Sequence, residues 1–140
     1  MKLNTTLLAL SALPLVAGAE IDFARDIRPI LSDNCFACHG PDRNTREADL
    51  RLDEREGALA NLDGARAIVP GKPEQSELMH RILTDDENDI MPPPKSNKTL
   101  TAQEKDLLKQ WIEQGAEYAQ HWAFIPPERP TPPKVSGTVQ

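Results

Sequence analysis

The sequence predicts a small all-α domain, and three observations support this fold class. Apolar side chains recur at helical spacing in residues 25–40, 73–83 and 99–116, whereas long period-two alternation is missing. Both cysteines of the chain lie at the end of the first of these segments. Aromatic residues make up 4% of the chain and there are 13 prolines, so the side chains supply little core volume. Small domains of this kind often depend on a disulfide, a metal or a cofactor.

The first predicted helix lies in "RDIRPILSDNCFACHG", residues 25–40. Asp26 is the expected N-cap, and Pro29 would lie in the first turn, where a proline is tolerated. Gly40 and Pro41 are the expected stop. The residues that follow helical spacing are Ile27, Ile30, Leu31 and Asn34.

The second helix is predicted in "PEQSELMHRIL", residues 73–83, with Ser76 or Glu74 near its start. Two adjoining rows of apolar residues run along it, Leu78 with Ile82 and Met79 with Leu83.

The third helix has the clearest signals. Thr101 and Glu104 have the spacing of a capping box, and Gly115 stands where a C-cap belongs. The expected buried face consists of Leu107, Leu108, Trp111 and Ile112.

The remaining segments are less regular. Residues 42–71 are charged and loosely patterned, and "ADLRLD" (48–53) and "RAIVPG" (66–71) could form two short extended pieces that pair with each other. After Tyr118 the chain is dense in proline, so residues 120–140 are expected to form an extended tail or linker.

The first 19 residues have the pattern of a signal peptide. Lys2 precedes an apolar stretch from Leu7 to Val16, and Ala17-Gly18-Ala19 is an A-x-A cleavage site. An uncleaved N-terminal anchor is the alternative. We therefore expect export to the periplasm or cell surface, one domain at residues 20–119, and no transmembrane segment after cleavage.

The net charge of −6 bears on partners. Nucleic acids and anionic lipids need a basic surface, so neither is expected as a partner. An acidic surface would instead steer a basic protein partner.

The stretch "CFACH" carries the chemistry. C-x-x-C-H is the attachment signature of haem c, in which Cys35 and Cys38 form thioethers and His39 becomes the proximal iron ligand. One helical turn places both thiols at the same edge of the macrocycle. The sequence therefore predicts one covalently attached haem.

Three other chemistries could use this motif. A disulfide here would close a very small loop and gain little stabilisation. A thioredoxin-like dithiol needs a strand before the motif, and here a helix precedes it. A zinc site would need His80 or His121 as a further ligand, at unusual spacing.

Met91 is the predicted distal iron ligand. It precedes three prolines, Pro92 to Pro94, which are expected to hold an extended loop and present the thioether. The alternatives are that Met91 is an ordinary packing residue, that the ligand is Met79, His80 or His121, or that the sixth position is open. Met79 shares an apolar helix row and reads better as core.

The order of these motifs resembles a class I mono-haem cytochrome c, an all-α fold. More narrowly, the segments "DIRPILSDNCFACHGPD", "LRLDEREGAL", "AIVPGKPEQSELMHRI" and "DIMPPP" resemble the planctomycete-type cytochrome c domain, over residues 23–124. The resemblance implies that Cys35, Cys38 and His39 bind haem and that Met91 is the distal ligand. Such domains usually lie at the N-terminus of larger exported proteins, so two readings are open: a stand-alone form, or a piece of a longer protein with further C-terminal domains.

Three functions are compatible with these expectations. One-electron transfer is favoured, because an iron with both axial positions filled suits electron exchange better than substrate chemistry. A haem sensor or accessory module of a larger exported enzyme is the alternative. A peroxidase is less favoured, since it needs an accessible sixth position and a distal acid–base residue, so the chain is expected to be an electron carrier rather than an enzyme.

Overall fold

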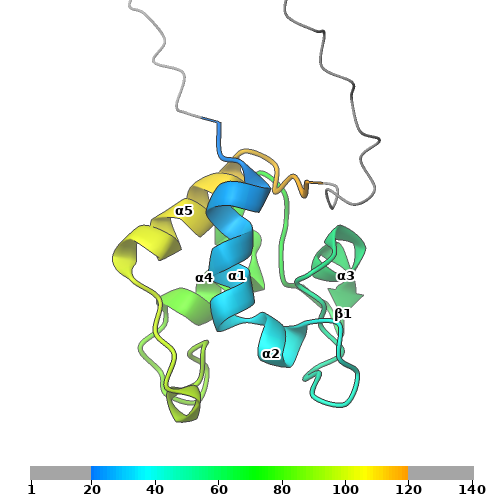
Figure 1. Ribbon diagram of the computed structural model, residues 1–140, viewed down its shortest axis with the longest axis vertical. Helices are drawn as coiled ribbons and strands as arrows, with labels where there is room; N and C mark the ends of the chain where they lie inside the picture. The colour runs from blue at the N-terminus through cyan, green and yellow to red at the C-terminus, as the bar shows by residue number, and fades with distance from the viewer. Residues whose placement is uncertain (1–19, 120–140) are drawn as a thin grey trace, which may run out of the picture.

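The computed structural model describes residues 20–119, which form a mostly helical domain with one short hairpin (Figure 1). The predicted signal peptide and the proline-rich tail lie outside the described residues. No helix within residues 20–119 is long and apolar enough to cross a membrane. The helical elements are η1 (Phe23–Ile27), α1 (Arg28–Asn34), α2 (Phe36–His39), α3 (Arg55–Leu59), η2 (Pro73–Gln75), α4 (Glu77–Leu83), η3 (Pro94–Ser96) and α5 (Ala102–Glu113).

The first helix starts earlier than predicted. Asp22, not Asp26, is the N-cap: its Oδ1 accepts a hydrogen bond from the Arg25 N–H at 2.7 Å. Asp26 instead accepts a hydrogen bond from the Asp22 N–H. Pro29 lies in the first turn of α1, as predicted. Because proline has no N–H to donate, the ladder is interrupted here, and the preceding turn η1 is a π-turn in which the Arg28 N–H reaches Phe23 O.

The second predicted helix divides into η2 and α4. Leu78, Met79 and Ile82 are buried, whereas Leu83 is 57% exposed. Ser76 precedes α4 but does not cap it with its side chain. Its hydroxyl accepts from the Val69 N–H and donates to Lys72 O, so the buried Ser76 ties the preceding loop to the helix.

The third predicted helix, α5, is confirmed in detail. Thr101 and Glu104 form both hydrogen bonds of the capping box. Leu108, Trp111 and Ile112 are buried on one face and Leu107 is half-buried. Gly115 follows the helix with φ +108°, the left-handed conformation that a helix-terminating glycine provides.

The two predicted extended pieces do not pair. The hairpin instead pairs β1 (Asn61–Leu62) antiparallel with β2 (Ala65–Arg66), and it overlaps the second predicted piece only at Arg66. Asp63 and Gly64 form the turn and both have positive φ, the conformation for which Asp-Gly is favoured. The all-α prediction therefore holds only as a mostly helical fold.

The hydrophobic core brings the N-terminal and C-terminal elements of the domain together. Helix α5 packs against η1 and α4. Phe23, Trp111 and Tyr118 form an aromatic cluster, with the Phe23 and Tyr118 ring centroids 4.4 Å apart. Figure 1 shows α1, α4 and α5 grouped together, while α2 and the loop from 84 to 101 lie towards the opposite end from residues 20 and 119, where the described segment begins and ends.

Candidate functional site

The cysteine motif sits at a break between two helices. Cys35 follows α1 with φ −122° and ψ −39°, and α2 then carries Cys38 and His39. The N–H groups of Cys38 and His39 both donate to Cys35 O, at 3.1 and 2.8 Å. Cys35 is half-buried against the core and Cys38 is exposed, and both are free cysteines. The turn therefore holds two unpaired thiols and one imidazole within five residues.

The environment of Cys35 disfavours a reactive thiolate. Burial raises its pKa to about 11, although the positive charge of Lys98 opposes this shift. Redox-active dithiols need at least one thiol with a lowered pKa. The Cys35 side chain is thus a neutral thiol at physiological pH, which argues against a thioredoxin-like role.

His39 has the properties expected of a metal ligand. Burial lowers the pKa of His39, although the backbone and carboxylate of Glu47 oppose this shift. The neutral imidazole is therefore favoured at pH 7. Its Nδ1 atom is buried and makes no hydrogen bond. A neutral imidazole keeps a lone pair for an iron, so the side chain fits the predicted role.

Backbone hydrogen bonds from residues 47–52 hold the motif in place. The Glu47 N–H donates to Cys38 O and the Leu52 N–H donates to His39 O, both at 2.8 Å. Directly after His39, Gly40 lies so close to α2 that an added Cβ would be 2.3 Å from Phe36 O. The chain can therefore leave the motif along this path only without a side chain at residue 40.

The loop that carries Met91 is attached at both ends. The Met91 N–H donates to Arg81 O at 2.9 Å, and the Lys98 ammonium donates to Asp33 O at the end of α1. Met91 is half-buried. Pro93 is extended, but Pro94 begins the turn η3, so the prediction of an extended backbone through all three prolines is wrong at Pro94. Local hydrogen bonding of residues 94–97 overrides the extended preference there.

The structure brings this loop beside the cysteine motif through Lys98, whose charge also acts on Cys35. In residues 20–119 no hydrogen bond or ion pair joins Met91 to His39. Figure 1 shows the loop and α2 toward the same end of the molecule. The placement of Met91 opposite His39 therefore stays a prediction.

The competing ligands have different environments. Met79 is 4% exposed and belongs to the hydrophobic core, as the apolar row predicted, and His80 is exposed. His121 lies outside the described residues. Within residues 20–119 there is no group of three or more His, Cys, Asp or Glu side chains that could hold a metal ion.

Residues 35–95 match the family model described as Planctomycete cytochrome C. This segment is similar to the planctomycete-type cytochrome c domain. The predicted resemblance is thereby confirmed, and the family indicates a c-type cytochrome that binds haem and iron. The matched segment begins at the first cysteine of the motif and includes Met91. No curated protein and no solved structure matches the chain.

Sequence reasoning missed several residues that organise the candidate site. Lys98 reaches a carbonyl 65 positions earlier in the chain, and Arg81 bonds both Asp89 and Glu77. No local pattern announces contacts of this kind. Among the described residues, one cavity of about 300 Å³ lies beside β2 and another lies beside Phe36 of the motif and Tyr118, and the predicted ligands line neither.

Proposed function

We propose that this protein is an exported mono-haem c-type cytochrome that transfers one electron. Cys35 and Cys38 would hold the haem through thioethers, His39 would bind the iron on one face and Met91 on the other. The observation that carries the proposal is the turn from Cys35 to His39, where free thiols stand beside a neutral imidazole within a segment that matches the family.

The chain's residues suit this cofactor in three respects. Each thiol can add across a vinyl group, with its hydrogen going to the neighbouring carbon, so the attachment needs no further oxidant. Backbone hydrogen bonds from Glu47 and Leu52 restrain the turn that orients His39. When bound, haem supplies a one-electron iron couple, and ligation by methionine and histidine raises its potential.

Electron transfer is supported over the other candidate functions by what surrounds the loop. A peroxidase would need a free acid–base group near the sixth position. Arg81 contacts the loop beside Met91, but its guanidinium is bound to Glu77 and Asp89. A haem sensor or accessory module of a larger exported protein stays the alternative. For an electron carrier of net charge −6, the partner we propose is a basic redox protein in the periplasm or at the cell surface.

The attachment is tested on haem-loaded protein. Haem should stay with the polypeptide during denaturing electrophoresis and acid–acetone extraction, and replacing both cysteines by alanine should release it. Extraction of free haem from the unaltered protein would refute covalent attachment.

The sixth ligand is tested by comparing Met91→Ala with Met79→Leu, a conservative control in the core. The ferric protein should show the weak near-infrared charge-transfer band of iron–sulfur ligation. Met91→Ala should abolish this band, lower the reduction potential and allow carbon monoxide to bind the ferrous iron, because the soft thioether donor is lost. Met79→Leu should leave all three unchanged. Carbon monoxide binding by the unaltered protein would instead favour the sensor or enzyme.

A further inference from the structure

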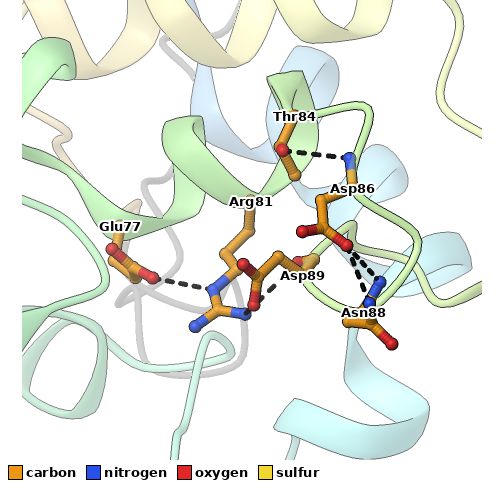
Figure 2. A network of polar contacts seen from close by, with 6 residues as sticks. All are labelled: Glu77, Arg81, Thr84, Asp86, Asn88 and Asp89. Atoms are coloured by element: carbon orange, nitrogen blue, oxygen red, sulfur yellow. Dashed lines mark hydrogen bonds and ion pairs between the residues drawn. The ribbon is translucent and has the colours of Figure 1, made fainter.

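Arg81 connects helix α4 to the segment just before Met91 (Figure 2). Its Nε donates to Glu77 Oε1 and its Nη1 to Asp89 Oδ1, both at 2.7 Å. Nη1 also lies 3.4 Å from Asp89 O. The Arg81 carbonyl in turn accepts the Met91 N–H at 2.9 Å. One residue therefore contacts the loop through its backbone and through its side chain.

Helix α4 and the loop, which Arg81 connects, differ in how they are anchored to the rest of the domain. Helix α4 is anchored by the buried Leu78, Met79 and Ile82. The part of the loop just before Met91 forms a small turn, in which Asp86 accepts from the Asn88 N–H and side chain (Figure 2). The Asp89 and Ile90 N–H groups also close back onto Asp86 O. At the start of this turn the Asp86 N–H donates to Thr84 Oγ1 at the end of α4, and at its other end, beside Met91, Arg81 makes the contact to α4.

We propose that Arg81 is a positioning residue for Met91. The Arg81–Asp89 ion pair holds the loop on α4 and thereby sets how often the Met91 sulfur leaves the iron. This inference rests on the proposed function, because it takes Met91 as the distal ligand.

The Arg81–Asp89 ion pair should have only a weak effect on loop opening, and this effect should depend on the salt concentration. The side chains of Arg81 and Asp89 are 36% and 49% exposed. Pairs exposed to this degree contribute little and are screened by ions. Removing the pair is therefore expected to increase loop opening by about two- to fivefold and leave the fold intact.

The variants separate the loop contact from general charge effects. Arg81→Met keeps the aliphatic stem and removes the guanidinium, and Asp89→Asn removes the charge on the loop side. Arg81→Lys keeps the charge and should restore part of the control. Glu77→Gln breaks a pair within α4, and Lys109→Gln breaks a comparable exposed pair with Glu113 on α5.

Two measurements are made on the haem-loaded protein. Imidazole binding to the ferric iron should reach a limiting rate at high imidazole concentration, and this rate reports departure of the native ligand. Hydrogen exchange of the Met91 amide reports the loop contact itself, whatever binds the iron. Arg81→Met and Asp89→Asn should raise both rates about two- to fivefold at low salt. Raising the salt concentration should increase both rates of the unaltered protein toward the values of these variants. It should leave both rates of Arg81→Met almost unchanged.

The outcomes distinguish the inference from the proposed function. Unchanged rates in Arg81→Met, or equal increases in Lys109→Gln, would overturn the inference. Faster Met91 amide exchange with an unchanged imidazole rate would also overturn it, because the ion pair would then hold the loop without governing the ligand. The proposed ligand itself fails if Met91→Ala does not alter the spectrum.

Discussion

Replacing Trp111 by alanine should be among the most destabilising single changes in this domain. Trp111 is 1% exposed on α5, and its ring lies 5.6 Å from Phe23 and 5.2 Å from Tyr118 between centroids. Its Nε1 donates to Glu117 O at 3.0 Å. The side chain thus joins η1, α5 and the segment that follows α5.

The expected loss follows from what the alanine leaves behind. A large-to-small change of a buried tryptophan costs about 3–5 kcal/mol. The two aromatic contacts and the hydrogen bond are lost together, so we expect a value near 5 kcal/mol. Trp111→Phe keeps an aromatic ring and removes the hydrogen bond, and should cost about 1–3 kcal/mol. Small domains have about 5–15 kcal/mol of stability, so Trp111→Ala should leave the protein barely folded.

The assay is guanidinium unfolding of haem-loaded protein, followed by far-ultraviolet circular dichroism. The midpoint should fall while the slope stays constant, which would show a change in stability rather than in the denatured state. Leu83→Ala is the matched control, because Leu83 is 57% exposed and its truncation should change stability by less than about 0.5 kcal/mol. A loss below about 1 kcal/mol for Trp111→Ala would refute the packing of α5 against η1.

Two further predictions concern residues near the site. Burial raises the pKa of Tyr118, the chain's single tyrosine, so its stabilising effect should be present below about pH 10 and be lost as the pH rises further. In an alkaline absorbance titration, phenolate should form only together with unfolding, and ionisation near pH 10 in the folded protein would contradict the burial. Gly40→Ala should destabilise the protein by about 1–3 kcal/mol, since its Cβ would meet Phe36 O at 2.3 Å. Thermal unfolding measures this loss, and an unchanged midpoint would show that α2 can move aside.

Helix α5 and the first helix show where sequence reasoning succeeds and where it fails. The capping box of Thr101 and Glu104 is readable because both partners lie within one turn. The N-cap of the first helix was placed at Asp26, yet both Asp22 and Asp26 take part in the hydrogen bonding there. Two acidic residues four positions apart both suit a helix start, so the pattern alone could not choose between them. The hairpin was missed although its Asp-Gly turn is a recognised signal, because its strands have only two residues each.

The candidate site likewise has features that the sequence predicts and features that it does not. The haem-attachment motif from Cys35 to His39 is a local sequence pattern. The prediction of Met91 as a ligand also rests on a local pattern, the prolines that follow it. Other properties of the site follow from tertiary packing, which a linear pattern does not contain. Cys35 is half-buried and has a raised pKa, and the Nδ1 atom of His39 is buried.

The sequence by itself determined the local features: the capped amphipathic helix α5, the buried row of Leu78 and Ile82 in α4, and the spacing of two thiols and an imidazole. These depend on interactions between residues one to four positions apart, so they are present in the order of the amino acids. Only the tertiary structure decided that Lys98 reaches Asp33, that Arg81 holds Asp89, and that Tyr118 donates to Leu52 O. The physical reason is that such contacts depend on the paths of the loops, which are set by the burial of side chains distant in sequence against one another.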